Sequence, residues 1–231
     1  MLMLQKVQTV LAHWAMNQVN TKYNTHIYID KVDLSTLGLI KLKGVEIKDH
    51  HQDSMVYIQK LSSHILSYKK LLKGNYDFET VSLDGLFLKI KIYKGETDDN
   101  FSHFLKSFDT STNKKPKKEF LLMASTVYLD DGEVFIIDDN NKKPLKAFFK
   151  KIKGTVKNFK IEGPKVFATI KKLYLVDNNT IEVKNLTADF TYSPQKIELL
   201  NALLKTPTSS IDAELVFTYK REDLRDFNNK V

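Results

Sequence analysis

The chain has 231 residues, 42% of them hydrophobic, no cysteine and a formal net charge of +8. This apolar content allows a sizeable core, and the lack of cysteine excludes disulfides, thiolate nucleophiles and cysteine-based zinc sites. Arg221 and Arg225 are the only arginines. Nucleic-acid binding is therefore disfavoured, because base readout relies on bidentate arginine contacts. A lysine-rich surface suits anionic phospholipid headgroups, and solvated lysines on outward strand positions are an equal alternative.

The first predicted element is an amphipathic helix within residues 1–23. Its apolar positions recur every three or four residues, which places them on one stripe: Leu4, Val7, Leu11 and Trp14. We interpret this stripe as membrane-proximal, because tryptophan is enriched at membrane interfaces; packing of the helix against a sheet is the alternative. No segment reaches the roughly 18 apolar residues of a membrane span, so we expect any anchor to lie outside this chain.

From residue 24 onward the hydrophobic pattern has a period of two, which is typical of strands. We predict a first β segment over 24–108, a Lys-rich loop over 109–119, a second β segment over 120–220 and a charged tail over 221–231. Within 100–108 a short helix is expected, with Asp99 or Asn100 as its N-cap. Because strand–helix–strand alternation is missing, the sequence predicts a mainly β fold built on a long, twisted antiparallel sheet.

Two of the predicted strands each present one continuous aliphatic face. These faces are the candidate lipid-facing surfaces, and their residues are Leu86, Leu88, Ile90 and Ile92 in the first segment and Ile211, Ala213, Leu215 and Phe217 in the second. The same alternation also builds the core of a closed β-sandwich, so the pattern alone leaves both interpretations open.

The polar motifs give no catalytic signature, and we predict a non-enzymatic protein without cofactor or metal. His50 and His51, between Asp49 and Asp53, are the most metal-like cluster. Neighbouring residues on a strand point to opposite faces, so these two histidines converge only in a turn. No third ligand set is evident for a metal, and a solvated hairpin turn is the favoured interpretation. The acidic runs at 130–132 and 138–141 lack the full spacing of a calcium loop and are interpreted as turns.

Several ordered strand motifs are similar to a known family. The segments Leu42–Asp49, Ser67–Gly74 followed by Val81–Leu88, and Asn185–Tyr192 resemble the N-terminal periplasmic part of TamB-type translocation and assembly proteins, in the AsmA-like superfamily. This resemblance implies a groove-like β-sheet with an apolar interior, held at the inner membrane by an N-terminal anchor that this chain does not contain.

The function that the resemblance implies is a periplasm-spanning conduit for phospholipids between the inner and outer membranes. Its partners would be phospholipid acyl chains and an outer-membrane β-barrel of the TamA/BamA type. Two alternatives remain open from the sequence. One is an assembly factor that templates strands of outer-membrane proteins by β-augmentation, and the other is a plain β-sandwich binding module.

Overall fold

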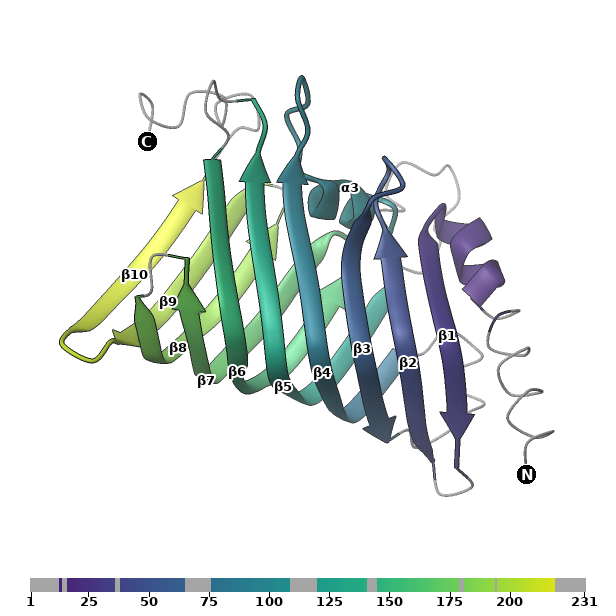
Figure 1. The fold of residues 1–231 in the computed structure, drawn as a ribbon, viewed down its shortest axis with the longest axis horizontal. Coiled ribbons are helices and arrows are strands. Elements are labelled where there is room, and N and C mark those ends of the chain that lie inside the picture. The colour runs from purple at the N-terminus through teal and green to yellow at the C-terminus, as the bar shows by residue number, and fades with distance from the viewer. Residues whose placement is uncertain are drawn as a thin grey trace.

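The computed structural model places ten strands in one sheet, ordered along the sheet as they are along the chain (Figure 1). The structure describes residues 13, 16–35, 38–64, 76–108, 120–140, 145–178, 181–193 and 195–218. The strands are β1 (His26–Leu34), β2 (Leu39–Lys48), β3 (Ser54–His64), β4 (Tyr76–Ile92), β5 (Leu121–Asp138), β6 (Leu145–Glu162), β7 (Lys165–Asp177), β8 (Glu182–Ser193), β9 (Lys196–Lys205) and β10 (Ser210–Thr218).

The expectation of a mainly β fold is confirmed, but the sheet is mixed because β4 and β5 pair in parallel. The other neighbouring strands are antiparallel, with the two halves of the chain joined in one sheet. The parallel pair requires a crossover connection, and helix α3 (Asn100–Lys106) lies within it. The short helix was predicted, and Asp99 is its N-cap. The strand–helix–strand unit was missed because this single short helix gives no repeating rhythm.

In β2, β3 and β4 the alternation of apolar and polar residues shifts by one position, and the three shifts lie side by side across the sheet. In β3, Ile58 is buried, the next two residues are exposed, and Leu61 packs on the same apolar cluster as Ile58. Gly44 and Gly85, with φ of 61° and 67°, lie at the shifts in the neighbouring strands β2 and β4. Glycine adopts this left-handed conformation without penalty. At these positions it lets the strand shift its alternation by one residue, so that the same face of the sheet is apolar before and after the shift.

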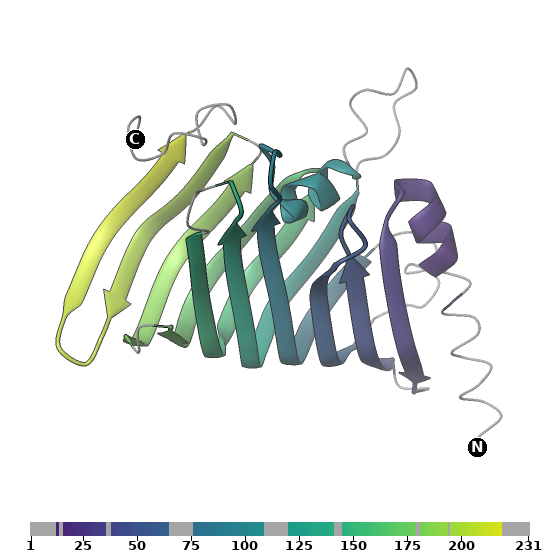
Figure 2. The ribbon, with the colours of Figure 1, turned by 45° about the horizontal axis from the view of Figure 1, so that its top comes forward.

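The sheet curls so strongly that the two ends of its long strands approach each other (Figures 1 and 2). Asn100 of α3 bonds to Lys91 near the end of β4, while Phe104 of α3 packs in a cluster with Tyr76, the first residue of β4. A straight strand would separate those two ends by roughly 50 Å, whereas α3 is only about 10 Å long. Helix α3 thus bridges two arms of one bent sheet.

A second helical segment, residues 16–23, packs on the apolar face near β1. Met16, Val19 and Tyr23 recur at helical spacing and contact the buried clusters. The segment ends at Tyr23, and Asn24 follows with a φ of 52°, a conformation that commonly terminates helices. Among the residues that the structure describes, no helix has the length and apolar character needed to cross a membrane.

Candidate functional site

One row of apolar residues crosses all ten strands on the same face of the sheet. Directly paired residues of neighbouring strands point to the same side, and each member of the row is the register partner of the next. In sheet order the row is Val32, Leu42, Leu61, Leu83, Leu129, Gly154, Leu173, Leu186, Leu204 and Ile211. We call it the leucine row. Nine strand spacings give it a length of about 43 Å.

Further apolar rows flank the leucine row over part of the sheet. On one side, Val81, Val127 and Val156 are successive register partners, followed by Ile170 and Ala188. On the other side lies a row that contains Ile27, Ile47, Val56, Leu88, Val134 and Phe149. The apolar face is therefore several residues wide as well as continuous from strand to strand.

The opposite face carries charge next to the leucine row. Lys31, Lys43 and Lys60 are register partners in β1 to β3, and Asp84 and Asp130 continue that line in β4 and β5. Lys60 and Asp84 form an ion pair of 2.7 Å. Such exposed pairs contribute little to stability, but they mark this face as the hydrated one, so the two faces of the sheet differ sharply in chemistry.

The apolar face is only partly covered. All seven leucines of the leucine row are partly exposed rather than buried, whereas residues at the centre of a two-sheet sandwich are enclosed by the second layer. Toward one end of the strands, α3 covers part of the face through Leu105, which packs against Val166 and Tyr192. The described strands form a single sheet, so no second sheet among them covers the apolar face. The helical segments cover part of it instead.

The predicted lipid-facing residues fall on two strands of this face. Leu86 packs on the same cluster as Leu83 of the leucine row, and Leu88, Ile90 and Ile92 follow it along β4, all partly exposed. Ile211 belongs to the leucine row, and Ala213, Leu215 and Phe217 follow it along the edge strand β10. Ile211 is 54% exposed. The predicted membrane-proximal residues Leu4, Val7, Leu11 and Trp14 lie outside the described residues.

A polar anchor joins the β2–β3 turn to the start of α3. The Asp49 carboxylate is 2% exposed and accepts four hydrogen bonds, from the backbone N–H groups of His51 and Asp53 and from the side chains of Tyr93 and Asn100. Burial alone raises the pKa of Asp49, but these four bonds outweigh it, and the pKa lies below its ordinary value. Asn100 also accepts a hydrogen bond from Lys91 N–H at 2.8 Å.

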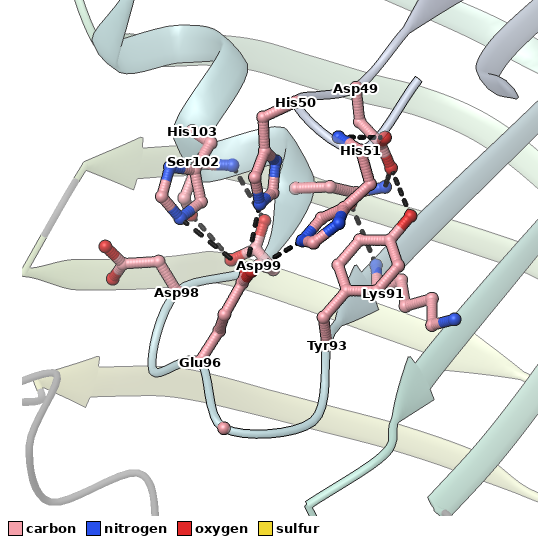
Figure 3. A network of polar contacts seen from close by, with 12 residues as sticks. Asp49, His50, His51, Lys91, Tyr93, Glu96, Asp98, Asp99, Ser102 and His103 are labelled. Atoms are coloured by element: carbon pink, nitrogen blue, oxygen red, sulfur yellow. Dashed lines mark hydrogen bonds and ion pairs between the residues drawn. The ribbon is translucent and has the colours of Figure 1, made fainter. Parts of the chain in front are cut away.

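Three histidines converge on Glu96 beside this anchor (Figure 3). The Glu96 carboxylate lies 2.9 Å from His50 Nε2, 2.6 Å from His51 Nε2 and 3.9 Å from His103 Nε2. The ring of His50 stacks on that of His103 at 4.1 Å. Burial lowers the pKa of His103, and the neighbouring His50 lowers it further. We call His50, His51, Glu96 and His103 the histidine cluster.

The sequence identified half of the histidine cluster. His50 and His51 lie in the predicted hairpin turn, where Asp49 N–H donates to Asp53 O at 2.9 Å. Glu96 and His103 were missed because they follow more than 40 residues later, in the connection to α3 and in α3 itself. The available signal was the predicted helix at 100–108, which contains a histidine, but no sequence pattern placed it near the turn.

Comparison with models of known protein families found no match, and a search of curated proteins found none either.

Proposed function

We propose that this chain is a segment of an apolar β-groove that carries phospholipid acyl chains between the inner and outer membranes. The observation that carries the proposal is the leucine row, which continues from β1 to β10 without a charged member. In a curled sheet, such a row runs along the axis of the curl. It offers an acyl chain a path across the strands, from one edge of the sheet to the other.

The dimensions suit this task. An acyl chain spans about half of a hydrocarbon core of roughly 30 Å, so a path of about 43 Å holds more than two chain lengths. Each buried methylene gains about 0.8 kcal/mol. Nine of the ten members of the row are branched aliphatic residues, and Gly154 in β6 is the exception, so the gain is similar at nearly every position and the chain meets no deep trap along the way.

Partial exposure of the seven leucines of the row, from Leu42 in β2 to Leu204 in β9, supports an open lining. A lipid tail needs apolar surface that is free to receive it, while its headgroup needs water. The row leucines are shielded enough to exclude a full hydration shell and exposed enough to be contacted. A closed β-sandwich would instead seal these residues in its core.

A second candidate function, strand templating for outer-membrane proteins, is favoured by β10. Its outer backbone edge pairs with no strand in the described part of the chain. Val216 and Ile211 of this edge strand are 50% and 54% exposed, and exposed apolar edges are templates for an added strand. Val216→Lys should then abolish capture of an outer-membrane β-strand peptide, and Tyr128→Lys, a substitution away from this edge, should not.

The conduit proposal is tested by native mass spectrometry of tag-free protein purified without detergent, followed by solvent extraction of bound lipid. Leu129→Asp places a charge in the leucine row, while Tyr128→Asp changes the adjacent residue, which is 47% exposed and points to the other face. We expect bound phospholipid in the wild type and in Tyr128→Asp, and its loss in Leu129→Asp.

A second matched pair guards against misfolding. The pair is Leu215→Asp, on the apolar face, and Val216→Asp, on the other face. The two residues are neighbours on the edge strand and are 42% and 50% exposed, so neither substitution places an aspartate in a buried core. Circular dichroism and thermal melting establish that each variant is folded. A lipid-free wild-type protein, or equal lipid content in both members of each folded pair, contradicts the conduit.

A further inference from the structure

The histidine cluster draws on three separate parts of the chain. His50 comes from the turn between β2 and β3, Glu96 from the connection between β4 and α3, and His103 from α3. His50 and Glu96 are 46 positions apart. Imidazole nitrogens and a carboxylate oxygen that converge from such distant segments form a donor set of the kind that holds a divalent transition metal.

The spacing of the donor atoms fits such an ion. One ligand atom each from His50, Glu96 and His103 lie within 4.8 Å of one another. Two ligands of a tetrahedral zinc ion, each about 2.1 Å from the metal, are about 3.4 Å apart. The distances from Glu96 Oε2 to the Nε2 atoms of His50 and His103, 2.9 and 3.9 Å, lie on either side of that value.

We propose that His50, Glu96 and His103 bind a divalent transition-metal ion with the coordination chemistry of zinc. The Nε2 atoms of both histidines and Glu96 Oε2 supply three ligands. The side chains are 28 to 37% exposed, which leaves a path for the ion and room for a water molecule as fourth ligand. The site is independent of the proposed lipid function.

The surroundings hold these ligands in place. His51 Nε2 lies 2.6 Å from Glu96 Oε1, the carboxylate oxygen that the metal does not need, and such outer contacts orient metal ligands. Asn140 fixes the Glu96 segment, because its side chain accepts from Gly95 N–H at 2.8 Å and donates to Glu96 O at 2.9 Å. The buried Asp49–Asn100 bond of 3.0 Å ties the turn to α3.

A bound ion would fasten α3 to the β2–β3 turn. Helix α3 bridges the two arms of the curled sheet, and it contacts the turn through the bond of Asn100 to Asp49 and the stacking of His103 on His50. Metal binding to the folded chain would therefore stabilise the crossover and raise the melting temperature as the free ion concentration increases.

The test is isothermal titration of tag-free, chelator-treated protein with Zn²⁺, with Co²⁺ absorption as the spectroscopic readout of coordination. His50→Ala, Glu96→Gln and His103→Ala should each weaken binding about tenfold or more, and His51→Ala should have a smaller effect. His64→Ala is the control, because His64 is an exposed histidine at the far end of β3. Thermal melting of each metal-free variant establishes that it is folded.

The expected result is one bound ion per chain and a melting temperature that rises with Zn²⁺. Both effects should weaken strongly in the three ligand variants, less in His51→Ala and not at all in His64→Ala. Binding that is equal in His103→Ala and His64→Ala would overturn the proposal, as would a Co²⁺ spectrum identical to that of the aqueous ion. Lipid extraction is a separate measurement. A protein that binds no metal can therefore still carry lipid, and a protein without lipid can still bind metal.

Discussion

Gly44→Ala tests whether the shift in alternation depends on left-handed glycine. Gly44 has a φ of 61°, and a Cβ atom there would lie 1.9 Å from Asp30 Oδ2 and 2.5 Å from Asp30 Cγ. Placing alanine in the left-handed region costs about 1 kcal/mol. Displacing the Asp30 side chain from its rotamer adds about 1 kcal/mol. We therefore expect a loss of about 2 kcal/mol in the free energy of unfolding.

Gly95→Ala is the matched control. Gly95 also has a positive φ, of 88°, but nothing lies within 4 Å of the position of its Cβ. Its substitution should cost only the backbone term of about 1 kcal/mol. Urea unfolding followed by circular dichroism measures both variants, and the extra 1 kcal/mol corresponds to a melting temperature about 2–4 °C lower for Gly44→Ala.

A double-mutant cycle with Asp30→Gly isolates the clash. Removing the Asp30 side chain should recover about 1 kcal/mol of the Gly44→Ala cost beyond additivity. Equal free energies of unfolding for Gly44→Ala and Gly95→Ala, without coupling to Asp30, would refute the argument. The close approach of Asp30 would then not determine the backbone conformation of β2 at Gly44.

The remaining predictions concern the polar anchor. Asn100→Ala leaves the Lys91 N–H unpaired and removes a donor from the buried Asp49 carboxylate, so urea unfolding should show a loss of about 3 kcal/mol. The lowered pKa of Asp49 stabilises the fold above the ordinary value of 3.8, and this contribution disappears as pH falls through the folded-state pKa. The stability difference between wild type and Asp49→Asn should accordingly stay constant near neutral pH and narrow as the pH falls below 3.8 toward the folded-state pKa; a difference that stays constant over that acid range as well would contradict the assigned bonds.

The local features of the fold were predictable from the sequence because they depend on neighbouring residues. Alternation identified the aliphatic face of Leu86 and Leu88. A cap at Asp99 or Asn100 was expected for α3, and the structure has it at Asp99. The Asp49–Asp53 segment was recognised as a turn from its polar residues, and the structure has it between β2 and β3. Each of these inferences rests on a periodicity or a capping preference within a few positions.

The long-range features were not predictable in the same way. The parallel pairing of β4 with β5 depends on how α3 crosses the sheet, which no local pattern encodes. The leucine row needs the register of all ten strands, including shifts such as the one between Ile58 and Leu61 that reverse the alternation. Glu96 and His103 join His50 only because the crossover returns α3 to the β2–β3 turn. Contacts between distant segments therefore determine both the apolar face and the histidine cluster.

Site-specific photo-cross-linking along the leucine row tests the central claim most directly. A benzophenone amino acid would replace Leu61, Leu129 or Leu204 in the row, or Lys60, Tyr128 or Lys205 as adjacent positions on the other face, in protein incubated with vesicles of labelled phospholipid. The account predicts cross-links to lipid at all three row positions and none at their neighbours. Equal labelling of both sets, or labelling confined to the charged face, would contradict an apolar path across the sheet.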